Sequence, residues 1–94
     1  MFEIVTSTKF IKDLKLLKKR SEKDFLLLKV LVGTLAEGGH KLLPKKYKAH
    51  KLSGDYKGYW ECHVKPDLLL IWDENEHISL IELVRTGTHS DLFR

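Results

Sequence analysis

Apolar positions in the first half of the chain recur at helical spacing. Phe10, Leu14 and Leu17 lie three or four residues apart with lysines between them, which places them on one face of a helix. A second series with similar spacing follows Ser21, at Phe25, Leu28, Val32 and Leu35. Gly38 and Gly39 come next and favour a helix end. The pattern therefore predicts two consecutive helices that form a hairpin.

Short polar residues mark where these helices begin. Thr6 or Ser7 can cap the first helix, because its hydroxyl accepts a hydrogen bond from a free backbone N–H. Ser21 followed by Asp24 is a variant of the capping box and predicts the start of the second helix. Ahead of both, residues 2–5 have the composition of a short strand.

After residue 50 the period changes from helix to strand. Residues 59–64 alternate between two sets of side chains, Tyr59, Glu61 and His63 on one side and Trp60, Cys62 and Val64 on the other. The second set is the more apolar and is expected to face the core. Residues 68–72 and 77–84 predict two further strands, separated by short turns at 65–67 and 73–76. Turns this short favour antiparallel pairing.

These elements predict an α+β fold. We expect a short N-terminal strand and a two-helix hairpin packed on one face of a mainly antiparallel sheet. Residues 1–94 are expected to form a single domain, because the chain is too short for two cores. The helices leave the other face of the sheet available for a site.

Composition narrows the setting. The chain is 43% hydrophobic and 32% charged, as is usual for globular proteins. It has one cysteine, Cys62, which excludes an internal disulfide. No stretch approaches the roughly 20 apolar residues of a membrane span, and the first residues do not resemble a signal peptide. We therefore expect a cytoplasmic protein with no membrane partner.

The positive charge is concentrated in the first half. The net charge is +4, yet residues 1–50 carry 12 basic and 5 acidic residues, and residues 51–94 carry 5 and 8. Lys9, Lys12 and Lys19 lie off the apolar stripe of the first helix. A cationic face of this kind attracts phosphate backbones without reading sequence. An ordinary solvated helix face has the same pattern, so both interpretations stay open.

Strand alternation assigns several reactive side chains to the open face of the sheet. His63 points away from the helices, and Asp67 follows in the next turn. Arg85 ends the third strand of the second half, and the segment after it can bring His89 back over the same face. His50 and Lys51 precede the turn that leads into the sheet. Three histidines, one carboxylate and one arginine can thus converge on one surface.

This set of residues suits the cleavage of RNA by its own 2′-hydroxyl. The reaction needs a base for the hydroxyl proton and an acid for the leaving 5′-oxygen, and two imidazoles can serve near neutral pH. Arg85 can stabilise charge that accumulates on the phosphate. Phe93 can stack on an unpaired base. The chemistry requires no metal and no cofactor.

Structural explanations exist for the same residues. His40 and His77 fit the description of ordinary surface or hydrogen-bonded histidines. Asp67 follows a proline and can serve the turn alone, and Phe93 can simply anchor the C-terminus. A zinc site built from the other three histidines is a further alternative. Their spacing, however, matches no standard ligand pattern, and Cys62 points to the opposite face.

Two stretches carry a resemblance to a known family. "YKAHKLSGDYKGYWECHVKPDLLLIW", residues 47–72, and "RTGTHSDLF", residues 85–93, resemble the YafQ-type toxins of the RelE superfamily. Each of the motifs H-x-L-x-G, H-x-K-P-D and R-x-G-x-H-S-x-L-F is weak alone, but their joint occurrence is specific. The resemblance extends to the length of the chain and the order of its elements.

The resemblance implies a messenger-RNA interferase of a bacterial type II toxin–antitoxin system. Such toxins typically cut transcripts in the ribosomal A site, so mRNA and the ribosome are the expected partners. A co-expressed antitoxin is a third partner, and it would connect the toxin indirectly to operator DNA. The positive charge of this chain favours an acidic, partly disordered antitoxin segment.

By motif match, the implied functional positions are His50, His63, Asp67, Arg85, His89 and Phe93. Some relatives have tryptophan where this chain has Leu68, so a base contact made by that ring is not expected here. We expect Lys9, Lys12, Lys19 and Lys51 to contact substrate. The alternative function is a catalytically silent module that binds RNA or antitoxin within a repressor complex.

Overall fold

Five strands form one sheet in the computed structural model, which describes residues 1–93. The strand order is β1-β5-β4-β3-β2, and the strands are β1 (Glu3–Thr6), β2 (His50–Lys51), β3 (Trp60–Lys65), β4 (Leu68–Asn75) and β5 (Leu80–Gly87). β1 runs parallel to β5, and the other neighbours are antiparallel. The expected mainly antiparallel sheet is confirmed.

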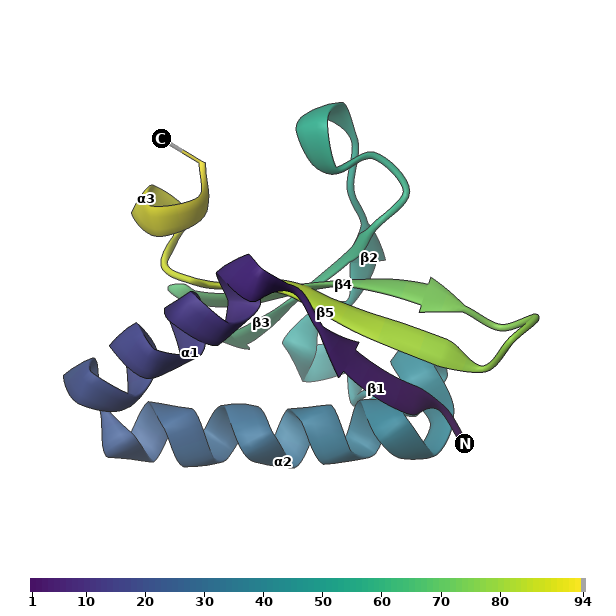
Figure 1. The fold of residues 1–94 in the computed structure, drawn as a ribbon, viewed down its shortest axis with the longest axis horizontal. Coiled ribbons are helices and arrows are strands. Elements are labelled where there is room, and N and C mark those ends of the chain that lie inside the picture. The colour runs from purple at the N-terminus through teal and green to yellow at the C-terminus, as the bar shows by residue number, and fades with distance from the viewer. Residues whose placement is uncertain (94) are drawn as a thin grey trace.

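The helical hairpin covers one face of this sheet (Figure 1). Helix α1 (Thr8–Arg20) is capped by Ser7 and helix α2 (Glu22–Gly38) by Ser21, whose side chains accept hydrogen bonds from the Phe10 and Asp24 amides. The core between helices and sheet contains Phe10, Leu17, Leu28, Leu31, Leu35, Cys62, Val64, Leu70, Trp72 and Ile81. The predicted core-facing set on β3 is thus confirmed. No helix in the described part of the chain is long and apolar enough to span a bilayer.

The hairpin between β4 and β5 lies further along the chain than the sequence pattern predicts. The expected turn at 73–76 is wrong, because β4 continues to Asn75, which pairs with Leu80. The expected strand at 77–84 begins and ends three residues later, as β5. Backbone pairing outweighs the turn preference of the polar residues, and Glu74 is held by hydrogen bonds from His40 and Trp72. The chain reverses instead near Ser79, whose φ is 52°.

The second face of the sheet carries two small elements that rise opposite the helices (Figure 1). One is the segment from β2 through the 3-10 turn η3 (Gly54–Tyr56), and the other is α3 (His89–Leu92). The 3-10 turns η1 (Gly39–Leu42) and η2 (Lys45–Tyr47) connect α2 to β2. A second apolar cluster lies beneath η3 and α3, formed by Leu69, Ile71 and Leu92 with Leu52, Tyr56, Tyr59 and Val84. This cluster is the floor on which the candidate site is built.

Candidate functional site

Strand register places four residues in one row across the second face. His50 on β2 pairs with Glu61 on β3. Glu61 pairs with Ile71 on β4, and Ile71 pairs with Arg85 on β5. Directly opposed residues of antiparallel strands share a face. Because neighbouring strands lie about 4.8 Å apart, the backbones of His50 and Arg85 are separated by roughly 14 Å. Ile71, which belongs to the apolar floor, separates the end of the row that carries His50 and Glu61 (the imidazole side) from the end that carries Arg85.

Glu61 is the central carboxylate on the imidazole side of this row. It is only 4% exposed, and its Oε1 lies 3.3 Å from His50 Nε2 and 4.0 Å from His63 Nε2. Its other oxygen, Oε2, is buried and has no hydrogen-bond partner among residues 1–93. A buried carboxylate is costly unless it is paired, so the two imidazoles are its natural counter-ions. Strand alternation predicts Glu61 on this face, but Glu61 is not among the predicted functional residues. Its position two residues before His63, on the same side of the strand, was the available signal.

Backbone carbonyls orient the two imidazoles. His50 Nδ1 lies 2.8 Å from the Lys48 carbonyl oxygen, and His63 Nδ1 lies 3.4 Å from the Pro66 carbonyl oxygen. A carbonyl oxygen only accepts hydrogen bonds, so in each ring Nδ1 is the donor. The Nε2 atoms are then the positions at which each ring can gain or lose a proton. The ring centroids are 6.4 Å apart, and both Nε2 atoms lie within 4.0 Å of Glu61 Oε1.

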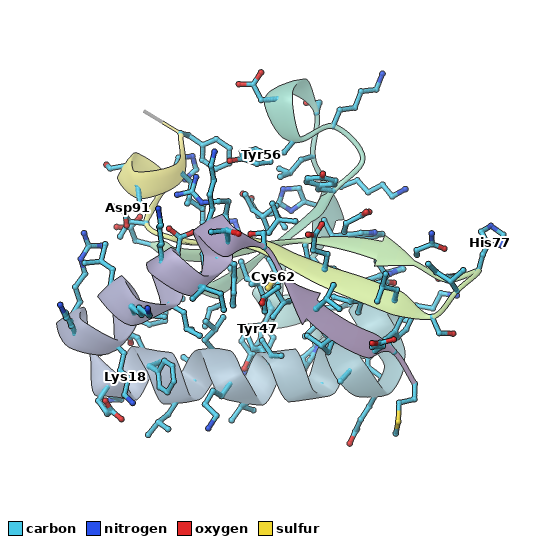
Figure 2. The ribbon with its side chains drawn as sticks, in the orientation of Figure 1. Lys18, Tyr47, Tyr56, Cys62, His77 and Asp91 are labelled. Carbon is cyan, nitrogen blue, oxygen red and sulfur yellow. The ribbon has the colours of Figure 1, made fainter. Side chains whose placement is uncertain are left out.

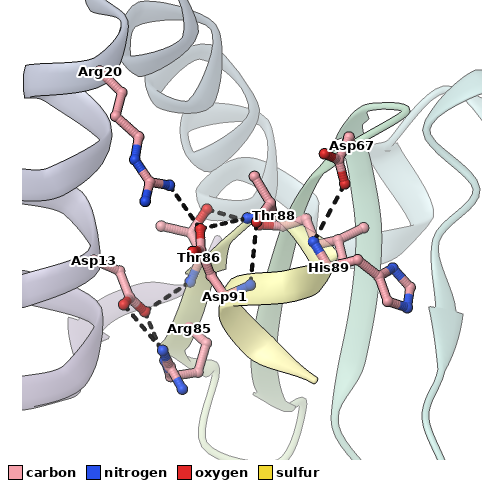
Figure 3. Close-up of polar contacts among 9 residues, drawn as sticks. Asp13, Arg20, Asp67, Arg85, Thr86, Thr88, His89 and Asp91 are labelled. Atoms are coloured by element: carbon pink, nitrogen blue, oxygen red, sulfur yellow. Dashed lines mark hydrogen bonds and ion pairs between the residues drawn. The ribbon is translucent and has the colours of Figure 1, made fainter. Parts of the chain in front are cut away.

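The C-terminal segment places His89 over this face through α3 (Figure 3). The His89 backbone N–H donates to Asp67 Oδ1 at 3.3 Å. Thr88 and Asp91 form a capping box at the start of α3, and Arg20 Nη1 donates to Asp91 Oδ2 at 2.8 Å. The hydrogen bond from Arg20, with help from Thr88, lowers the pKa of Asp91 to about 2. The cap is therefore ionised at neutral pH, and Asp67 holds the backbone of His89 rather than its ring.

Near the C-terminus, the Phe93 ring contacts the rings of His89 and Tyr56. The Phe93 side chain is 41% exposed, and its ring lies 5.1 Å from the His89 ring and 5.9 Å, edge-on, from the Tyr56 ring. Tyr56 comes from η3 and belongs to the apolar floor. Figure 2 shows Tyr56 beside the C-terminal segment. The predicted aromatic position is thus at the site, and Tyr56 is a neighbour that sequence reasoning missed.

Arg85 is not a free cation. Its guanidinium is bound by the Asp13 carboxylate of α1, with Nε to Oδ2 at 2.7 Å and Nη2 to Oδ1 at 3.1 Å. The hydrogen bond with Asp13 raises the pKa of Arg85 above its ordinary value against the opposing effect of burial, and Tyr56 adds to the increase. Arg85 therefore stays charged at every pH of interest.

The predicted lysines do not all gather at the histidines. Lys9, Lys12 and Lys19 are exposed on α1, in the helical layer. Lys51 follows His50 directly and is also exposed, with Nζ 5.9 Å from the centre of the Trp60 ring. Lys51 is next to His50 in β2, but it pairs with Trp60, which packs against the helix-side core, so its side chain lies on the opposite face from the histidines.

Two cavities contain candidate site residues in their linings. One has a volume of about 410 Å³ and is lined partly by Asp13, Asp67 and Arg85. The other, of about 510 Å³, lies against His63 and is lined also by lysines and Tyr47. Both lie within the size range of about 300–1,000 Å³ that is typical of ligand sites.

The remaining histidines are remote from this site. His40 Nδ1 lies 2.6 Å from Glu74 Oε2, and its ring stacks on Trp60 with the centroids 3.9 Å apart. His77 is exposed in the β4–β5 turn, at the far end of the sheet in Figure 2. Among residues 1–93, the side chains with metal-ligand atoms all within 4.8 Å of one another are His40, Glu74 and Glu76. The alternative set of three histidines at the site does not form such a group in this structure.

Known proteins similar to this chain match it over nearly its whole length. The family model of the bacterial toxin YafQ of type II toxin–antitoxin systems matches residues 2–94. The mRNA interferase toxin YafQ of Escherichia coli K12 is 43% identical over 91 residues, covering 97% of this chain and 95% of that protein. A chain in the crystal structure of the E. coli DinJ-YafQ complex has 41% identity and a TM-score of 0.84, with 100% of both chains covered. A metal-bound toxin from Helicobacter pylori has 47% identity and a TM-score of 0.85, with 99% of this chain and 100% of that chain covered.

Proposed function

Because this chain belongs to the YafQ toxin family, we propose that it is an endoribonuclease that cleaves messenger RNA by attack of the 2′-hydroxyl. The 94 residues act as one catalytic domain in the cytoplasm, and cleavage takes place at the ribosome. An antitoxin neutralises the enzyme, as suggested by the DinJ-YafQ complex of the E. coli relative. The toxin reaches operator DNA only through that antitoxin.

One observation supports this reaction above others, namely the placement of proton-transfer groups on both sides of the apolar floor. Glu61 lies between His50 and His63 on one side, with Oε1 3.3 Å from the nearer imidazole. His89 lies above the floor on α3, and Arg85 lies at the other end of the row. A base, an acid and a cation for the phosphate are thus available around one strip of surface.

Each residue then has a defined part. His89 exchanges a proton with the reacting oxygens, and His50 and His63 share proton transfer under the influence of Glu61. Asp67 orients the segment that carries His89, since it accepts the backbone N–H at 3.3 Å. Arg85 stabilises the pentacoordinate phosphate, and Phe93 stacks on a base beside the cut. Lys51 contacts the RNA backbone from the other face of β2, the edge strand that carries His50.

We expect cleavage to be independent of a metal ion. Purified protein is incubated with a defined RNA, with and without ribosomes, and products are resolved on a gel. EDTA is added in the ribosome-free reaction, because it would remove the magnesium that ribosomes need. The ribosomal reaction keeps magnesium and receives a chelator selective for transition metals. Cleavage in the ribosomal reaction should survive the selective chelator, and any cleavage in the ribosome-free reaction should survive EDTA, because imidazoles and a guanidinium provide the chemistry.

Two results would contradict this proposal. Loss of cleavage on chelation with recovery on adding zinc or copper would assign a catalytic metal, and the metal-bound relative from H. pylori makes this arm necessary. RNA binding without cleavage in any reaction would favour a silent RNA-binding module instead.

The exposed lysines of α1 are expected to contribute to binding and not to chemistry. Changing Lys9, Lys12 and Lys19 together to glutamine should weaken association with RNA or ribosomes. If each lysine contacts one phosphate, the salt dependence should become flatter. The negative slope of log K against log salt should decrease in magnitude by about 2. Saturated cleavage should stay nearly unchanged. The matched control replaces three other exposed lysines, Lys23, Lys29 and Lys41, and an equal effect there would mean that net charge alone matters.

The basic first half also bears on the antitoxin. Residues 1–50 have 12 basic against 5 acidic side chains. An acidic segment that is disordered when free can fold onto such a surface, since charge complementarity speeds association and selects the partner. The proposed antitoxin segment is therefore acidic.

A further inference from the structure

Within residues 1–93, the edge of β5 next to Arg85 has no neighbouring strand. β1 pairs with β5 only along Leu80–Leu83. Beyond that point, side chains that follow β1 take the place of a strand. Ser7 Oγ donates to the Val84 carbonyl oxygen at 2.8 Å, and Asp13 Oδ2 accepts the Thr86 N–H at 3.1 Å. Asp13 is thereby fixed against the strand that carries Arg85.

The same carboxylate accepts two hydrogen bonds from the Arg85 guanidinium (Figure 3). Both side chains are largely buried, with 14% of Asp13 and 18% of Arg85 exposed. In this geometry the Asp13 oxygens face the Nε–Nη2 side of the guanidinium. Paired, two-point contacts fix the orientation of an arginine better than a single contact does. The positive charge of Arg85 is also compensated in the resting protein.

The two hydrogen bonds to Asp13 leave part of the Arg85 guanidinium available to bind a phosphate. The group has five N–H donors, of which Asp13 takes one on Nε and one on Nη2. Both hydrogens of Nη1 and one of Nη2 are not bound by Asp13, and the Tyr56 side chain also interacts with this guanidinium. These hydrogens lie along the end of the guanidinium, where two phosphate oxygens can be bound together.

We propose that Asp13 is a positioning residue for the RNA-cleavage reaction and acts through Arg85. It directs the free end of the guanidinium toward the phosphate, and it reduces the attraction of Arg85 for a phosphate that carries a single charge. The pentacoordinate state carries more negative charge, so the aligned arginine favours it over the bound substrate. Catalysis depends on such a difference between the two states. This role rests on the proposed function.

The test separates charge from alignment with two variants. In Asp13→Asn the amide oxygen can still accept the Thr86 N–H, but the amide N–H groups oppose the donors of Arg85. We expect kcat to fall about tenfold, because alignment is lost. KM should fall a few-fold, because the uncompensated arginine attracts the substrate more strongly. Asp13→Glu keeps the charge but moves the carboxylate, so kcat should fall while KM stays unchanged.

The chain offers a matched control beside the same cavity. Asp24 of α2 binds Lys65 Nζ at 3.1 Å, and both residues line the cavity that contains Asp13. Asp24→Asn removes the same charge and should leave kcat and KM at their wild-type values. An equal change in both Asp→Asn variants would overturn the proposal in favour of a general electrostatic effect.

A double-variant comparison links Asp13 to Arg85. Adding Asp13→Asn to Arg85→Ala should lower kcat no further than Arg85→Ala alone. A full additional loss in the double variant would show that Asp13 acts on its own and would overturn the proposal. Wild-type cleavage by Arg85→Ala would instead contradict the role proposed for Arg85 in the reaction.

Nuclear magnetic resonance tests the alignment without any cleavage assay. The Nε–H of Arg85 should exchange slowly with water in the wild-type protein and rapidly in Asp13→Asn. Rapid exchange in the wild-type protein would overturn the proposal even if RNA is cleaved. A protein with slow exchange and no cleavage would place the failure in the proposed function.

Discussion

Replacing His89 with alanine is expected to lower the single-turnover rate of RNA cleavage by a factor of about 10² or more. His89 is exposed on α3 with its ring beside that of Phe93, and in the proposed reaction it exchanges a proton with a reacting oxygen. The backbone N–H of residue 89 still donates to Asp67 in the variant, so α3 should stay in place. Affinity for RNA should change little, since phosphate contacts come mainly from lysine and arginine.

His77 provides the matched control for His89. It is an exposed histidine in the β4–β5 turn, far from the candidate site. His77→Ala should cleave RNA at the wild-type rate in the same assay. Similar rates for the His89 variant and the wild-type protein would remove His89 from the proton-transfer steps.

Replacing Glu61 with glutamine is expected to reduce cleavage by about 10² and to leave the protein equally stable or more stable. The carboxylate is buried beside the two imidazoles, and its Oε2 has no partner within residues 1–93. Glutamine keeps the size but removes the charge that attracts imidazolium. Removing this charge relieves a desolvation cost and leaves no deeply buried charge unpaired, because the side chains of His50 and His63 keep contact with solvent. Single-turnover kinetics and urea unfolding would measure the two effects.

Glu82 supplies the control for this second experiment. It lies on β5, pairs with Asp73 of β4 and is remote from the histidine pair. Glu82→Gln should leave the cleavage rate unchanged. If Glu61→Gln lowers stability and rate together, Glu61 serves the fold. If the rate is unchanged, its carboxylate has no part in proton transfer.

Local patterns in the sequence predicted β1, the two long helices and the three long strands in their observed order, but not β2, the 3-10 turns or α3. The helical stripes, the two serine caps and the alternation along β3 each depend on residues within a few positions of one another. The same alternation correctly placed His63 on the open face. The motifs of the second half predicted the toxin family, and the family match confirms it.

The boundaries that failed were decided by pairing between distant residues. Asp73 to Asn75 have the composition of a turn, yet they extend β4 because β5 lies opposite them. Local residue preferences carry no information about a distant strand, because the hydrogen bonds between two strands form only after the strands meet. The β4–β5 hairpin was therefore predicted with its turn too early.

In the candidate site, the difference between what local sequence and what tertiary contacts determine is larger still. Sequence by itself determined which reactive residues exist and, through strand parity, that His63 and Glu61 share a face. Only the tertiary structure decided that Glu61 is buried against the histidines and that Asp13, 72 positions from Arg85, holds its guanidinium. The physical reason is that burial and ion pairing depend on distance in space, and the register of β2 to β5 and the docking of α1 set these distances. Residue type specifies what chemistry is possible, and packing determines which groups are close enough to perform it.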